Sequence, residues 1–259
     1  ATIAAVTSAG PISVALALIA GCGGAGTPAT PDAAPFDPSD AAVALPDATP
    51  GVPLPGFGDI TGACGAIDAA ALTGAAPMLY RGDLDFARDR YDDPAERPQL
   101  TPGGQVIVAS DNAGGSSIFS ETFAFELLAR CELAALVKLE TEIVYDVAGD
   151  KTDILVELDG TKVGVSVTRA VTFPFGSPYT PLAAQELVDR KLAGILESSA
   201  NVSADDAWQK QILAVLAYDT QHADVFADAW AAAEPALRAD TLVLLFVTDG
   251  DDLFIYTDS

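Results

Sequence analysis

The sequence is poor in positive charge. Of its 259 residues only 13 are Lys or Arg, against 37 Asp or Glu, which gives a formal net charge of −24. Proteins bind duplex nucleic acid largely by placing Lys and Arg against phosphates, so this balance argues against nucleic acid as a routine partner. One histidine and three cysteines leave little material for a zinc or other soft-metal site.

The amino-terminal part lacks basic residues altogether, since no Lys or Arg precedes Arg81. The apolar run at 12–21 is too short for a membrane-spanning helix, which needs about 20 residues, but it suits the hydrophobic region of a signal peptide. A signal peptide also needs a basic start. The chain begins at Ala1 without one, so we expect the true start to lie upstream.

Ile19-Ala20-Gly21-Cys22 resembles a bacterial lipobox, in which an aliphatic residue and two small residues precede a lipidated cysteine. The resemblance implies a lipoprotein acylated at Cys22, held in the cell envelope on the inner or outer membrane, with the membrane as a partner. Several acyl chains anchor a protein firmly, because each buried methylene contributes about 0.8 kcal/mol. An ordinary signal peptide, or a buried helix with an incidental cysteine, are the alternatives.

Proline is dense after this motif, with eight prolines between residues 23 and 58. Proline removes backbone donors and fixes φ, so neither helix nor sheet can propagate and an extended tether is expected. The predicted organisation is a signal peptide at 1–21, a lipidated cysteine and linker at 22–58, and a globular domain at 59–259. An exported domain can form disulfides, so Cys64 and Cys131 are either bridged or two buried free thiols.

Hydrophobic periodicity and turn signals predict an α/β (α+β) domain, with a central mixed sheet flanked by helices. Val163, Val165 and Val167 alternate with smaller residues, and Asp159-Gly160 is a hairpin signal. The predicted helices are 120–130, 182–198, 204–217 and 222–237. The predicted strands are 105–109, 136–145, 151–158, 162–171, 241–248 and 253–257.

Thr152-Asp153-Ile-Leu-Val, a hairpin, and Lys162-Val-Gly-Val-Ser-Val-Thr168 resemble the core of the PD-(D/E)XK, or restriction-endonuclease-like, superfamily. The resemblance implies an αβββαβ order over about 120–248 and a divalent-metal phosphodiesterase, with Asp153 binding Mg²⁺ or Mn²⁺. The superfamily's acidic-x-Lys triplet is degenerate here, because it reads Ser166-Val167-Thr168.

Other residues can supply what the triplet lacks. The resemblance allows the lysine or an acid to come from the next helix, as Lys191 or Glu186, with Lys191 assisting the attacking water. Ser166, Thr168 and Arg169 would line the cleft and hold a phosphate or carboxylate. The second metal-binding carboxylate would come from one of Glu121, Glu126 and Glu142.

Each of these residues also has a purely structural interpretation. Asp153 can be a solvated strand-end residue, Lys191 a salt-bridged lysine, and Ser166, Thr168 and Arg169 the exposed face of a strand. Glycines in 112–117 can free backbone amides for an anion or simply form a capping turn. Two functions therefore stay open: a metal-dependent hydrolase, or a non-catalytic envelope module that binds a protein or a cell-surface component.

Overall fold

The computed structural model describes residues 51–87, 95–110 and 117–257. The predicted signal peptide, Cys22, most of the linker and residues 112–116 of the glycine-rich run lie outside the described residues. No helix in the described part of the chain is long and apolar enough to cross a membrane.

Seven strands form one mixed sheet in the order β1-β2-β7-β6-β5-β4-β3. Strands β2, β7, β6 and β5 run parallel, β4 and β3 are antiparallel to their neighbours, and β1 is antiparallel to β2. The strand bounds are β1 Asp59–Gly62, β2 Met78–Asp85, β3 Ala135–Leu139, β4 Ile154–Leu158, β5 Thr161–Ala170, β6 Lys210–Ala217 and β7 Leu242–Asp249.

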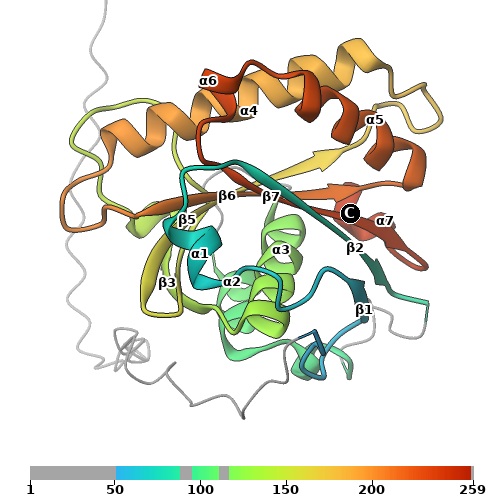
Figure 1. Ribbon diagram of the computed structural model, residues 1–259. Coiled ribbons are helices and arrows are strands. Elements are labelled where there is room, and N and C mark those ends of the chain that lie inside the picture. The colour runs from blue at the N-terminus through green and yellow to red at the C-terminus, as the bar shows by residue number, and fades with distance from the viewer. Residues whose placement is uncertain (1–50, 88–94, 111–116, 258–259) are drawn as a thin grey trace, which may run out of the picture. The chain divides into compact units, whose positions relative to one another are not determined.

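Helices cover both faces of the sheet, with α4, α5 and α6 on one side and α1, α2 and α3 on the other (Figure 1). Each face has its own apolar core, one packed on α3 and the other on α4 and α5. The helix bounds are α1 Ala69–Thr73, α2 Pro102–Ala109, α3 Ile118–Glu132, α4 Pro181–Asn201, α5 Thr220–Ala232, α6 Pro235–Arg238 and α7 Leu253–Tyr256. Short 3₁₀ turns occupy η1 Arg97–Gln99 and η2 Glu140–Glu142. The chain is therefore a mixed α/β protein, as predicted.

From α3 to β6 the elements follow the order αβββαβ. The hairpin between β4 and β5 turns at Asp159 and Gly160, whose φ values are +49° and +73°. Two positive φ values in a two-residue turn match the twist of the flanking strands. The hairpin predicted from Asp159-Gly160 is confirmed.

Two predictions of element type are wrong where the apolar run is continuous. The helix predicted at 204–217 is absent: residues 204–209 contain a turn and irregular chain, and 210–217 form strand β6, in which every residue is buried. A run that is apolar on all sides carries no period that separates helix from strand. Residues 105–109, predicted as a strand, belong to α2, where Thr101 caps the helix by accepting from the Gly104 amide at 3.2 Å and Pro102 occupies the first turn.

Three further differences lie at element ends. Residues 253–256, predicted as a strand, form the short helix α7. The predicted strand 136–145 ends at Leu139, because the next three residues turn into η2. Helix α3 begins at Ile118 rather than Ser120, and it is buried on nearly every side instead of being amphipathic.

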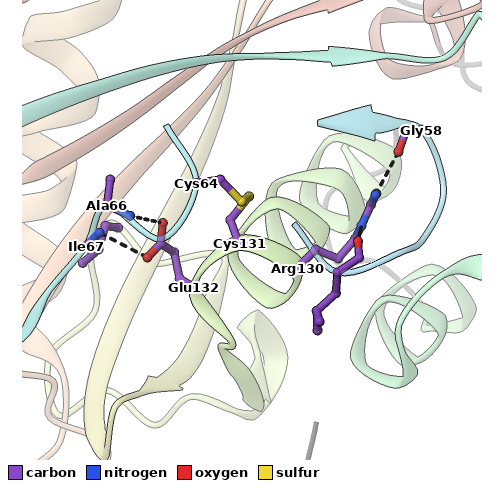
Figure 2. The surroundings of a disulfide bond; sticks show 8 residues. Gly58, Cys64, Ala66, Ile67, Arg130, Cys131 and Glu132 are labelled. Atoms are coloured by element: carbon purple, nitrogen blue, oxygen red, sulfur yellow. Dashed lines mark hydrogen bonds between the residues drawn. A yellow bond between two sulfur atoms is a disulfide. The ribbon is translucent and has the colours of Figure 1, made fainter. Parts of the chain in front are cut away.

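The last turn of α3 holds the segment before and around β1 (Figure 2). Arg130 donates to the backbone oxygens of Leu54, Phe57 and Gly58. Cys131 forms a disulfide with Cys64. Glu132, the next residue, accepts from the amides of residues 66 and 67 at 3.1 Å each. Because Phe57 is fully buried, the packed part of the chain begins before residue 59.

Candidate functional site

A cavity of about 610 Å³ opens at the carboxyl end of β5, between the start of α3 and the first half of α4. This size lies within the usual range for small-molecule sites. Its charged and polar lining residues are Ser117, Ser120, Glu121, Asp153, Thr168, Arg169, Thr172, Glu186, Arg190 and Lys191. Its apolar and aromatic lining residues are Val167, Val171, Phe173, Tyr179, Ala183 and Leu187.

The cavity brings together most of the residues predicted from the sequence: Glu121, Asp153, Thr168, Arg169, Glu186 and Lys191. Ser166 lies apart from this group, because it lines a second cavity of about 290 Å³ that shares Arg190 and Lys191 with the first. Thr168 and Arg169 are consecutive residues of β5, so their side chains point to opposite faces of the sheet. The guanidinium of Arg169 donates to the Ile255 carbonyl at 3.0 Å.

Two of the candidate carboxylates lie elsewhere. Glu142 is exposed on η2, and its side chain accepts from the Leu139 amide at 2.9 Å. Glu126 is buried inside α3 and accepts from the Thr101 amide and hydroxyl at 2.9 and 2.6 Å. Neither residue lines either cavity, so the structure does not support their predicted place beside Asp153.

Asp153 and Lys191 both bind the backbone of one residue of β5, Val167. The Val167 amide donates to Asp153 Oδ2 at 2.6 Å, and Lys191 Nζ donates to the Val167 carbonyl at 2.7 Å. Burial raises the pKa of the Asp153 carboxyl, against the opposing attraction of Lys191 and the Val167 amide. The two predicted catalytic groups therefore take part in joining β4, β5 and α4.

These residues do not fit a divalent-cation centre of the expected kind. One oxygen of Asp153 is already taken by a backbone amide, and hard cations such as Mg²⁺ need several oxygen ligands around one point. Within the described residues, no group of three His, Cys, Asp or Glu side chains is placed to hold a metal ion. We therefore derive no step through Mg²⁺ or Mn²⁺.

The cavity is lined by charged side chains of both signs, three acidic and three basic. Arg169, Arg190 and Lys191 line it, three of the 13 basic residues of the chain. Arg190 is exposed and makes no hydrogen bond or ion pair with a described residue. Its guanidinium is therefore available to a ligand.

Among the cavity residues that sequence inspection missed are Arg190, Phe173 and Tyr179. For Arg190 the available signal was helical spacing. Residues three to four apart share one face of a helix, and on α4 this face includes Ala183, Leu187 and Arg190. The two aromatic residues follow β5 in a proline-rich loop, where the sequence has no periodicity.

Known proteins offer limited similarity. No protein-family model matches the chain. Over 162 residues, or 60% of the chain, it is 36% identical to the AAC-rich mRNA clone AAC4 protein of Dictyostelium discoideum, and this match spans 24% of that protein's length. Among solved structures, it is similar to Pyrococcus furiosus SfsA in complex with Ca²⁺, with a TM-score of 0.27, at 15% identity over 51% of this chain and 55% of that one. Neither similarity assigns the chain to a family.

Proposed function

We propose that this domain is a non-catalytic binding module that holds an anionic group, a phosphate or a carboxylate, in the cavity beside β5. The observation that carries the proposal is Arg190, an exposed arginine in the cavity wall that makes no hydrogen bond or ion pair with a described residue. A planar guanidinium suits bidentate recognition of a phosphate or carboxylate.

The acidic residues of the cavity do not cancel this positive charge at Arg190. Burial raises the pKa of the Asp153 carboxyl, and the attraction of Lys191 opposes that rise, so the charge of Lys191 is directed at Asp153. Glu121 is buried within the first turn of α3. Glu186 is exposed and lies one turn before Arg190 on α4. The guanidinium of Arg190 is thus exposed and without a partner among the described residues, so it can bind an anion.

The engaged positions of Asp153 and Lys191 favour binding over metal-dependent hydrolysis. A general catalyst must reach the proton or the reacting atom directly or through one water. Here both groups are hydrogen-bonded to the backbone of Val167. The hydroxyl of Thr168 adds a neutral donor to the cavity wall.

Titration calorimetry of the full chain with inorganic phosphate tests the proposal. We expect saturable binding, and about a tenfold loss of affinity in Arg190→Gln, because a hydrogen bond to a charged group contributes about 1.5–3 kcal/mol. Arg81→Gln is the matched control, since it removes one exposed arginine on β2 that does not line the cavity. Equal affinities in all three proteins would contradict the proposal. So would Mn²⁺-dependent cleavage of DNA or RNA that is lost in Asp153→Ala.

The same proposal includes an envelope anchor at Cys22. Its support is the apolar run, the lipobox-like residues and the proline-rich spacer, together with a disulfide, which persists in oxidising compartments. We expect the chain, produced in a bacterial host with a basic signal-peptide start added before Ala1, to incorporate radioactive palmitate, and Cys22→Ala to lose the label. A Cys22→Ala chain that is labelled as strongly as the wild type would contradict the anchor.

A further inference from the structure

The anion cavity has an aromatic rim that the proposed function does not use. Phe173 lines the cavity, and 57% of its surface is exposed. Phe173 is one of the most exposed large apolar residues in the described part of the chain. Its position on the rim, beside the charged wall, distinguishes it from apolar residues scattered singly over the surface.

The ring of Phe173 is held from behind by other aromatic side chains. It packs edge-to-face on Phe175, with ring centroids 4.8 Å apart, and Phe175 in turn lies 5.6 Å from Tyr218. Tyr218 contacts His222 edge-to-face at 5.6 Å. A side chain supported in this way loses little freedom when a ligand packs on it.

This series of rings returns to the same cavity. His222 stacks on Tyr179 with centroids 4.9 Å apart and an interplanar angle of 16°. Tyr179 is buried and lines the cavity, and its hydroxyl has no hydrogen-bond partner among the described residues. His222 is fixed by its ring nitrogen, which lies 2.6 Å from Asp219 Oδ1. Both ends of the ring series, Phe173 and Tyr179, therefore form walls of the anion cavity.

The lining thus has two parts with different chemistry. One part is charged and includes Arg190, and the other is apolar and aromatic, with Phe173 and Tyr179 as its largest members. A small inorganic anion uses only the charged part. A ligand with a flat apolar group next to its anionic group uses both.

We propose that the ligand of this cavity is an aromatic anion, in which a planar ring is attached to a phosphate or a carboxylate. The anion binds Arg190, and the ring packs on the exposed face of Phe173. This assignment rests on the proposed function, because it uses the same arginine for the charged group.

Calorimetric titrations of the full chain compare phenyl phosphate with inorganic phosphate, and benzoate with acetate. We expect the ring to raise affinity about tenfold in the pair whose anion matches the natural ligand, as expected for aromatic contact and burial. The pair that shows the larger gain identifies the anion. Phe173→Ala should remove the gain while leaving inorganic phosphate or acetate affinity unchanged, which also shows that the variant is folded.

Leu196→Ala is the matched control, because Leu196 is a 39% exposed apolar residue on α4 that lines neither cavity. It should keep the full gain. If the simple anions bind and the ring adds nothing in either pair, the aromatic-anion assignment is overturned and the proposed function stands. If neither simple nor aromatic anions bind, both are overturned.

Discussion

Asp153 has a structural role that explains its position without a metal ion. Its amide donates to the Val165 carbonyl at 3.1 Å, and its carboxylate then accepts from the Val167 amide at 2.6 Å. The side chain supplies the acceptor that a further strand residue would otherwise provide, so the pairing of β4 with β5 continues past the start of β4. The cost is a carboxylate held where burial raises its pKa.

Replacing this carboxylate with an amide should stabilise the fold at neutral pH. Because the pKa of Asp153 is higher in the folded than in the unfolded state, ionisation of its carboxyl destabilises the fold. The folded protein therefore loses stability as the pH rises from the unfolded-state pKa to the raised pKa. Asn keeps an oxygen for the Val167 amide and carries no charge. We expect Asp153→Asn to raise the thermal midpoint at pH 7, and the difference from wild type to shrink as pH falls below the raised pKa.

Asp150→Asn is the control, because it removes one exposed carboxylate three residues earlier and changes the net charge equally. A lower midpoint in Asp153→Asn than in wild type at pH 7 would show that the attraction between Asp153 and Lys191 outweighs the cost of burial.

At the scale of single residues, the strand pattern of the sequence predicted the site residues in and next to β4 and β5. The residues that α4 adds to the site depend on how that helix packs on the sheet. Asp153 directly precedes β4 and Thr168 and Arg169 lie on β5, and the hairpin signal at 159–160 predicted that these two strands pair. Arg190 entered the site only because α4 crosses the end of β5 at one particular rotation. The sequence of α4 shows which residues share a face but not which face meets the cavity.

At the scale of elements, local chemistry predicted well where it was distinctive. Helix α4 combines a Thr180 cap with Pro181 in its first turn, and both signals are visible in the sequence. Strand β6 was misassigned because a fully buried strand and a buried helix present the same apolar run. What settles β6 is its pairing with β5 and β7, which is a property of the assembled sheet.

The end of α3 allows a prediction at this scale, because its disulfide closes a separation of 67 residues. Closing a loop of this length in the unfolded chain stabilises the native state by about 4 kcal/mol on the chain-entropy estimate. The double substitution Cys64→Ser and Cys131→Ser should lower the free energy of unfolding in urea by about that amount.

Arg130 and Glu132 still hold the same segment in that variant, so we expect a weaker but folded domain. Wild-type protein unfolded in the presence of a reductant should match the variant. An unchanged unfolding free energy in both would contradict the role assigned to the disulfide.

At the scale of the whole molecule, the charge of −24 and the guanidinium of Arg190 act in opposite directions on an anion. The overall field repels anionic ligands over distances up to roughly 10 Å at ordinary salt. Binding then depends on contacts within the cavity, where Arg190 is close enough to hydrogen-bond a ligand. A single charge substitution in the cavity therefore changes the net charge of −24 by only one, but it changes the electrostatic potential within the cavity strongly.

The most direct test of the account is a pair of opposite substitutions, one turn apart on α4, titrated with inorganic phosphate. Arg190→Gln and Glu186→Gln remove charges of opposite sign from the same cavity wall. Glu197→Gln removes an acid from α4 outside both cavities. The account predicts weaker binding in Arg190→Gln, tighter binding in Glu186→Gln by about two- to fivefold, and no change in Glu197→Gln. Phosphate affinities that are the same in Arg190→Gln, Glu186→Gln and wild type would contradict it.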